Sequence, residues 1–231
     1  IHKNYGLPDI NKNYFYIFSS HSGNTEEIIN GFKEALIKNL PLAVISTGGK
    51  LLALAKKSKT PYVQIPNEVP PRLSVGYMVV ALIKLTGKAL LVRLEPLSLK
   101  SDGEQLAKKI KNKIPIIYSS EKNEGLALNW KIRLNESGKT PSFYNVFPEL
   151  NHNEMVAPSR DFYYILLKDD KDSPKIKKRM MVFEKIYKKS KLDIVSVNLK
   201  GKNIWERIFN SIILADWTSY YLATQSHKDP E

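Results

Sequence analysis

Short apolar runs alternate with longer segments of helical spacing from residue 14 onward, and this alternation limits the fold more than any other feature. Runs rich in β-branched and aromatic residues predict strands, and apolar residues spaced three and four apart predict helices. The expected strands are 14–18, 42–46, 61–65, 114–118, 143–147, 162–167 and 194–197. The expected helices are 25–40, 50–59, 72–85, 99–112, 124–134, 151–156, 174–189 and 204–224. This pattern predicts an α/β protein whose parallel sheets are covered by helices.

The same local unit occurs twice, which predicts two related halves. A strand, a Ser-rich loop and a helix follow one another at Ser19 and again at Ser119. We therefore expect a first subdomain over residues 1–99, a Lys-rich linking helix over 100–112, and a second subdomain over 113–231. The last helix is long and mostly apolar, so we expect it to be buried between layers or at a subunit contact.

Composition excludes several classes of protein. The chain of 231 residues has no cysteine, so neither a disulfide framework nor thiolate chemistry is available. None of its four histidines is paired at metal-ligand spacing, which argues against a His-based zinc site. The longest apolar stretch, residues 75–94, is interrupted by Lys84, Lys88 and Arg93, and no signal-peptide pattern is present. We expect no metal site and no membrane segment.

The net charge of +13 has two interpretations. A basic field attracts anions such as nucleic acid, lipid headgroups or phosphorylated metabolites. A Lys-rich surface can equally be a solvated one without a partner. Residues 168–191 hold nine Lys and one Arg against four acids, without the interleaved aromatic side chains that stack on bases. This favours a solvated surface over nucleic-acid binding.

The loop after the first strand carries the strongest local chemistry. Ser20-His21-Ser22-Gly23-Asn24-Thr25 lies between a strand and a helix start, where an α/β sheet binds its ligands. Helix N-termini present unpaired N–H groups and partial positive charge, and three hydroxyls (Ser20, Ser22 and Thr25) can donate to phosphate oxygens. Ordinary helix capping is the alternative. A flavin mononucleotide and a sugar phosphate both fit such a loop.

A second candidate constellation lies in the second half. Glu136 is expected near a helix end, and His152 follows sixteen residues later. A carboxylate and an imidazole that face one bound sugar could move protons between its carbons and oxygens. A solvated glutamate and a capping histidine are the alternative.

Five motifs stand in an order that resembles one enzyme family. They are Ser20-His21-Ser22-Gly23-Asn24-Thr25-Glu26-Glu27, Thr47-Gly48-Gly49-Lys50-Leu51, Pro70-Pro71-Arg72, Asn135-Glu136-Ser137 and Pro148-Glu149-Leu150-Asn151-His152-Asn153-Glu154. This order is similar to that of the bifunctional phosphoglucose/phosphomannose isomerases, which have paired sugar isomerase (SIS) domains. The resemblance implies two SIS-type parallel-sheet subdomains flanked by helices, as flavodoxin-like three-layer sandwiches.

The resemblance also implies an activity and a role for each matching residue. It implies a cytoplasmic aldose–ketose isomerase, without metal or cofactor, that interconverts glucose 6-phosphate or mannose 6-phosphate with fructose 6-phosphate through a cis-enediol. Ser20, Ser22 and Thr25 match the phosphate loop, and Arg72 matches an arginine that stabilises the enediolate. Glu136 matches the base between C1 and C2. His152 matches the residue that opens the sugar ring, which in the family comes from the neighbouring subunit of a homodimer.

Three features depart from the family pattern. The family has a Gly-rich segment ahead of the first strand, with a Ser that contacts phosphate, and the sequence starts at Ile1, after that position. His21 stands where the family usually has Tyr. The family's last helix carries a Thr and a Lys near the site, and Lys228 is the candidate for the basic one. A non-catalytic sugar-phosphate-binding SIS module is therefore the main alternative, ahead of a flavin-binding electron carrier or a nucleic-acid-binding protein.

Overall fold

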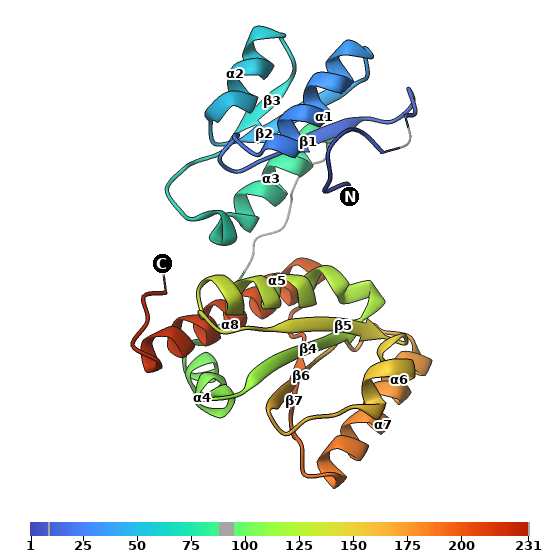
Figure 1. Cartoon of the computed structure of the whole chain (residues 1–231), viewed down its shortest axis with the longest axis vertical. Coiled ribbons are helices and arrows are strands. Elements are labelled where there is room, and N and C mark those ends of the chain that lie inside the picture. The colour runs from blue at the N-terminus through green and yellow to red at the C-terminus, as the bar shows by residue number, and fades with distance from the viewer. Residues whose placement is uncertain (9, 88–94, 231) are drawn as a thin grey trace. The chain divides into compact units, whose positions relative to one another are not determined.

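The computed structural model describes residues 1–8, 10–87 and 95–230, and the chain forms two compact units, residues 1–91 and 92–231 (Figure 1). Residues 88–94, which end the longest apolar stretch, lie outside the described residues. The elements of the first unit are β1 (Tyr16–Ser19), α1 (Glu26–Ile37), β2 (Leu42–Ser46), α2 (Gly49–Lys57), β3 (Tyr62–Gln64), the 3-10 turn η1 (Pro71–Leu73) and α3 (Val75–Leu85).

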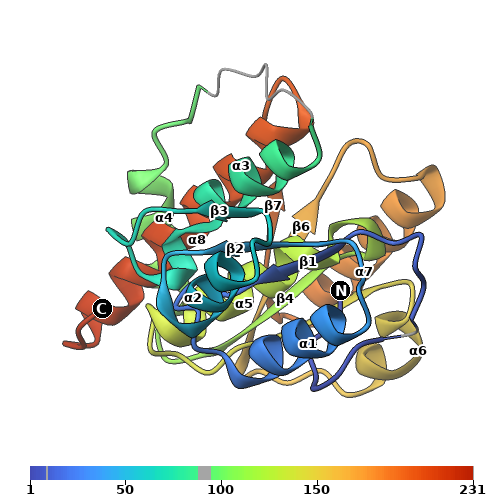
Figure 2. The same ribbon diagram turned by 90° about the horizontal axis from the view of Figure 1, so that it is seen from above.

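The first unit is a three-layer sandwich around the sheet β1-β2-β3, in which all pairs are parallel. β2 is buried along all five residues, because helices cover both of its faces (Figures 1 and 2). Phe18 and Val44 point to one face and pack against α1 and α2. Ile17 and Ile45, one position away in each strand, point to the other face and pack against α3.

The second unit contains a four-stranded parallel sheet in the order β5-β4-β6-β7. Its elements are α4 (Lys100–Ile110), β4 (Ile114–Ser120), η2 (Glu121–Asn123), α5 (Glu124–Glu136), β5 (Phe143–Phe147), α6 (Leu150–Asn153), η3 (Glu154–Val156), β6 (Phe162–Lys168), α7 (Pro174–Lys189), β7 (Asp193–Asn198) and α8 (Ile204–Gln225). The helices α4, α5 and α8 pack together on one face, and α7 covers the other (Figure 1).

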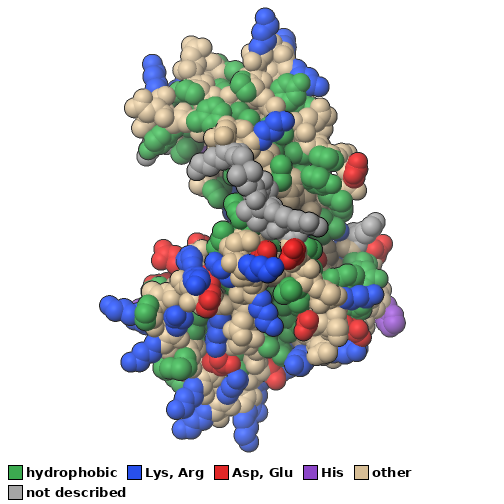
Figure 3. All heavy atoms as spheres, turned by 180° about the vertical axis from the view of Figure 1, so that it is seen from behind, with side chains coloured by type: hydrophobic (Ala, Val, Ile, Leu, Met, Phe, Trp, Pro, Cys, Tyr) green, Lys and Arg blue, Asp and Glu red, His purple; other side chains and the backbone are tan. Residues whose placement is uncertain are grey.

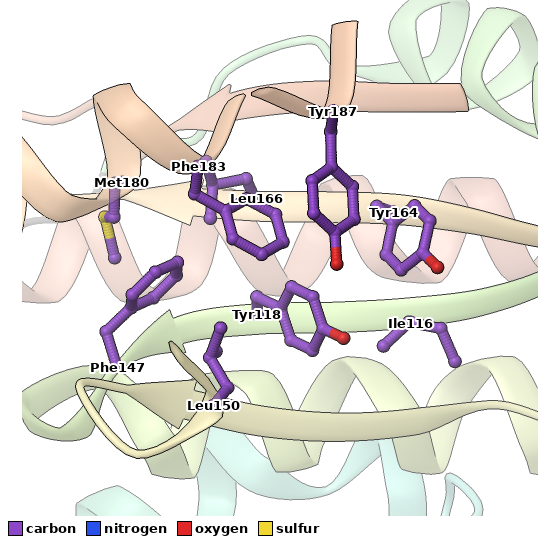
Figure 4. Close-up of a cluster of buried hydrophobic side chains, with 9 residues drawn as sticks. All are labelled: Ile116, Tyr118, Phe147, Leu150, Tyr164, Leu166, Met180, Phe183 and Tyr187. Atoms are coloured by element: carbon purple, nitrogen blue, oxygen red, sulfur yellow. The ribbon is translucent and has the colours of Figure 1, made fainter. Parts of the chain in front are cut away.

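The face beneath α7 is an aromatic core. Tyr118 and Tyr164 from the sheet meet Phe183 and Tyr187 from α7, and Phe147 closes the cluster at the end of β5 (Figure 4). The rings of Phe183 and Tyr187 stack with centroids 3.9 Å apart, and most of the other pairs meet edge to face. This cluster fixes the positions of β4, β5 and β6 relative to α7.

The contact between α4 and α8 depends on a glycine, which gives a first prediction. A Cβ added at Gly103 would lie 2.4 Å from the Trp217 Cβ and 3.0 Å from the Thr218 N. Gly103→Ala should therefore destabilise the protein by about 1–3 kcal/mol through overpacking. Gly125→Ala, also in a helix but with nothing within 4 Å, should be neutral or stabilise it by up to about 1 kcal/mol. Urea unfolding measures both, and a Gly103→Ala protein at least as stable as wild type would contradict the packing argument.

The structure corrects several predicted boundaries. The helix expected from Arg72 begins at Val75, because Pro71–Leu73 form a separate 3-10 turn. Ser119 and Ser120 belong to β4 rather than to a loop after it, because the ladder with β5 continues through both. The helix expected to end at 134 continues to Glu136. α4 packs on α8 within the second unit, and its interpretation as a linker between subdomains stays a prediction.

Basic side chains are spread over the second unit and interspersed with acidic ones on the face drawn in Figure 3. Several lysines are paired: Glu184 binds Lys168 and, at 2.6 Å, Lys188. Burial alone would raise the pKa of the Glu184 carboxyl, but these donors outweigh it and lower the pKa to about 2. Among the described residues, no helix is long and apolar enough to cross a membrane.

Candidate functional site

The Ser-rich loop joins β1 to α1 and is organised by its own hydroxyls. The Ser20 and Thr25 hydroxyls bond each other at 2.8 Å, and the Gly23 N–H donates to the Ser20 Oγ at 3.1 Å. Ser20 is buried, whereas Ser22 is exposed and its Oγ accepts from the Asn24 N–H at 3.2 Å. The structure thus brings the three predicted phosphate-binding hydroxyls into one turn, with that of Ser22 facing solvent.

Thr25 is the N-cap residue of α1 but does not cap it. Its side chain makes no hydrogen bond to the first turn of the helix, because it bonds Ser20 instead. The ordinary-capping interpretation is therefore wrong for Thr25. Without a side-chain cap, the first N–H groups of α1 keep donor capacity for an anion, and the helix dipole adds partial positive charge there.

Two glycines let this loop pack directly on the loop that follows β2. Gly23 has a φ of 68°, and a Cβ there would lie 1.9 Å from the Gly48 carbonyl oxygen. Gly49 also has a φ of 68°, and its Cβ would lie 2.3 Å from the Ser22 carbonyl oxygen. The Thr47 N–H and Oγ1 both donate to the His21 carbonyl, at 2.9 and 2.7 Å. The Thr47-Gly48-Gly49 motif therefore holds the shape of the Ser-rich loop.

Arg72 follows the third strand of the same sheet. Because β1, β2 and β3 are parallel, the segments after them leave from the same edge of the sheet. Arg72 is half-buried in η1. Its neighbours Pro71 and Ser74 border a groove of about 810 Å³ that His21 also lines, so the turn that holds Arg72 and the Ser-rich loop both border one groove of the first unit.

The environment of the His21 side chain could not be predicted from the sequence. Its Nε2 is buried and has no hydrogen-bond partner among the residues that the structure describes. The groove that it lines is otherwise largely apolar, with side chains from β1, α1 and α3. This buried imidazole nitrogen of the Ser-rich loop is available to a ligand that enters the groove.

Glu136 is the last residue of α5 and is exposed. The turn after it is held in place, since Asn135 Oδ1 accepts from both the N–H and the hydroxyl of Ser142, at 2.9 and 2.7 Å. Lys228 reaches the same turn, where its Nζ donates to the Lys139 carbonyl at 3.2 Å. The structure therefore places Lys228 beside the turn that carries Glu136.

His152 lies at the other end of β5. Ser142, which bonds the Glu136 turn, precedes β5, whereas α6 with His152 follows its end (Figure 1). Five residues of strand span about 16 Å. His152 is exposed, and its backbone N–H bonds the Glu149 carbonyl at 2.9 Å. Within one chain, the second unit thus separates the predicted base from the predicted ring-opening imidazole.

The second Ser-rich segment differs from the first in that its polar groups are engaged. The Ser120 hydroxyl donates to Asp172 at 2.7 Å, and Asn123 donates to Ser120 at 3.0 Å. Asp169 accepts from Lys122 at 3.1 Å. Burial alone would raise the pKa of Asp169, but its donors, led by the Lys171 N–H and Lys122, hold that pKa below its usual value. The segment forms an internal network that includes two buried carboxylates.

In the described ranges, no three His, Cys, Asp or Glu side chains come together to hold a metal ion. In the first unit, the Ser22 hydroxyl and the imidazole nitrogen of His21 are open to a ligand, a combination that suits an anion. In the second unit, Glu136 and His152 are exposed, and a carboxylate and an imidazole are side chains that can transfer protons.

Comparisons with known proteins identify the family that the chain is similar to. Residues 99–231 match the family model described as the bacterial phospho-glucose isomerase C-terminal SIS domain. The bifunctional phosphoglucose/phosphomannose isomerase of Aquifex aeolicus is 32% identical over 246 residues, 99% of this chain and 76% of that protein. That of Caldicellulosiruptor bescii is 31% identical, over 100% and 76%. Glucosamine-6-phosphate deaminase of Thermotoga maritima shares the fold, with a TM-score of 0.72 at 18% identity over 97% of this chain and 74% of that one.

Proposed function

Because the chain belongs to the family of bifunctional phosphoglucose/phosphomannose isomerases, we propose that it is a sugar-phosphate isomerase for glucose 6-phosphate, mannose 6-phosphate or both, with fructose 6-phosphate as the ketose. The observation that carries the proposal is the turn after β1, where hydroxyls gather at a helix start that no side chain caps. We place the reaction in the cytoplasm.

The phosphate ester is bound by the loop after β1. Ser22 is the exposed donor, while Ser20 and Thr25 complete the hydroxyl set and the first N–H groups of α1 add backbone donors. Arg72 supplies the fixed positive charge for the enediolate, a role that suits Arg because it stays ionised at any working pH.

Proton transfer between C1 and C2 is the role of Glu136. A carboxylate is a suitable base because it can take the proton from one carbon and return it to the next without leaving its place. Glucose and mannose 6-phosphates differ only at C2 and give the same enediol, so one base serves both substrates. Lys228, beside the Glu136 turn, is the candidate for a basic side chain that interacts with substrate oxygens.

His152 opens the sugar ring, and we propose that it acts in the site of a second copy of the chain. The position of His152 beyond one end of β5, with Glu136 before the other, supports this assignment because one imidazole and one carboxylate must reach the same hexose. The functional protein would then be a homodimer.

The proposed function predicts turnover of at least one aldohexose 6-phosphate. Enzyme-coupled assays of the full-length protein on glucose 6-phosphate and mannose 6-phosphate measure it, each with and without a chelator. We expect isomerisation at the same rate in both conditions, because the proposed steps use side chains alone. A chelator-sensitive rate would contradict that mechanism. Phosphosugar binding with no turnover on either substrate would instead identify a non-catalytic SIS module.

A further inference from the structure

The segment that carries His152 is attached to the core on both sides of the imidazole. α6 continues into η3, so Leu150 and Glu154, four residues apart, lie on the same side of this segment. Leu150 is fully buried in the aromatic core. His152, halfway between them, lies on the opposite side and is exposed. The segment is thus anchored in the core by the Leu150 side chain before the histidine, and the Glu154 carboxylate follows the histidine on the same side as Leu150.

The Glu154 carboxylate has a donor on each oxygen. The Tyr118 hydroxyl from β4 donates to Oε2, and the Asn145 side-chain amide from β5 donates to Oε1. Asn145 is fixed in this orientation because its own Oδ1 accepts from the Val146 N–H at 2.8 Å. Both oxygens of Glu154 are therefore bound to neighbouring strands of the sheet.

Tyr118 is a rigid donor. Its ring is 2% exposed and packs against Phe183 at 5.4 Å and Tyr164 at 5.9 Å between centroids. Figure 4 shows its ring within the cluster. Burial, and next the bond to Glu154, raise the pKa of the Tyr118 hydroxyl well above its usual value, so the hydroxyl keeps its proton and donates. The position of Glu154 is thereby tied to the buried aromatic core of the second unit.

We propose that Glu154 is a positioning residue for His152, which it holds through the Tyr118 and Asn145 bonds. The inference rests on the proposed ring-opening role of His152. A carboxylate accepts stronger hydrogen bonds than a neutral group does, and two donors from different strands fix its direction as well as its distance. An imidazole that transfers a proton must be placed to within a fraction of an ångström, which a short exposed turn does not provide by itself.

Glu154→Gln tests this with almost no change in volume. A glutamine offers one acceptor oxygen and one amide donor, so either Tyr118 or Asn145 loses its acceptor. We expect kcat to fall roughly 10- to 100-fold, with KM within about threefold, because the imidazole is displaced while the phosphate loop is untouched. Glu149→Gln, an exposed carboxylate of the same segment, is the matched control and should retain wild-type kcat.

A double variant separates positioning from a direct or general structural role. In a His152→Gln background, adding Glu154→Gln should change kcat by less than about twofold, because Glu154 acts only through His152. A further drop equal to that of the single variant would overturn the inference. Tyr118→Phe, which removes one donor and keeps the ring, should lower kcat in the same direction by a smaller factor.

A second readout does not require activity. In hydrogen–deuterium exchange, the backbone of residues 150–156 should exchange at least about tenfold faster in Glu154→Gln than in wild type, with the rest of the second unit unchanged. Glu149→Gln should leave exchange as in wild type. Unaltered exchange in Glu154→Gln would show that the carboxylate does not hold the segment. An inactive wild-type protein with the expected exchange result would refute the proposed function and leave the attachment of the segment established.

Discussion

Replacing Glu136 with glutamine is expected to lower kcat by roughly a thousandfold while phosphosugar binding is retained. The amide has the size of the carboxylate but cannot accept the proton from C1 or C2, and a positioned general base contributes about 10²- to 10⁴-fold. Binding should remain because the phosphate loop belongs to the first unit and Glu136 to the second. The coupled assay gives kcat, and calorimetric titration with fructose 6-phosphate gives the dissociation constant.

The control for this variant lies at the other end of the same helix. Glu124 is the first residue of α5, is exposed like Glu136, and carries the same charge. Glu124→Gln should leave kcat within about twofold of wild type, because loss of one surface charge has only a small effect on the fold. A Glu136→Gln protein with wild-type turnover would refute the base assignment. Loss of binding together with turnover would indicate a structural defect instead.

Removing the carboxylate of Asp216 is expected to cost about 3–5 kcal/mol of stability. Arg133 on α5 is 1% exposed, and its Nε bonds Asp216 on α8 at 2.6 Å. Asp216→Ala takes from that buried guanidinium the carboxylate that it bonds, which is far more costly than losing a surface ion pair. Chemical unfolding of the second unit, followed by tryptophan fluorescence, measures the loss, since all three tryptophans lie in this unit.

Asp170 provides the comparison for Asp216. Its side chain is 71% exposed and lies 3.9 Å from the Lys171 ammonium. Asp170→Ala should change the free energy of unfolding by less than about 1 kcal/mol, as expected for a solvated pair. A similar small change in Asp216→Ala would mean that Arg133 tolerates the loss of this bond and that other contacts, such as the bond from the Trp130 indole to the Ser211 hydroxyl at 2.9 Å, are enough to hold α5 on α8.

Much of the fold follows from local sequence because each element has its own signal. Phe143–Phe147 and Pro174–Lys189 have the predicted bounds, the second because Ser173 and Pro174 start the helix unambiguously. Boundaries that depend on neighbours were less accurate. The sequence Ser119-Ser120 resembles a loop, but both residues stay in β4 because β5 offers partners for them. The β-propensity of a residue does not take into account pairing with a strand more than twenty residues away in the sequence.

The candidate site likewise has features that local sequence predicts and features that depend on distant residues. The phosphate loop could be predicted because its hydroxyls, its glycine and the helix start lie within six residues. Glu136 and His152 were candidates from their chemistry, and the family resemblance added their specific roles, which stay predictions. Glu154 was part of the quoted motif, but no role was inferred for it because Tyr118 lies 36 residues before it. Nor did the sequence indicate that Thr25 bonds Ser20 in place of capping α1.

The Ser120 hydroxyl already has an intramolecular hydrogen-bond partner, the Asp172 carboxylate. Asp172 is tethered to the same chain, so its effective concentration at Ser120 exceeds that of any free metabolite. A phosphate dianion would have to displace it and would then face the negative charge of Asp169 as well. The two Ser-rich segments therefore differ: the Ser22 hydroxyl is exposed to solvent, whereas the Ser120 hydroxyl is already bonded to Asp172. Of the two Ser-rich segments that the structure describes, only the one after β1 therefore has a hydroxyl exposed to a ligand from solution.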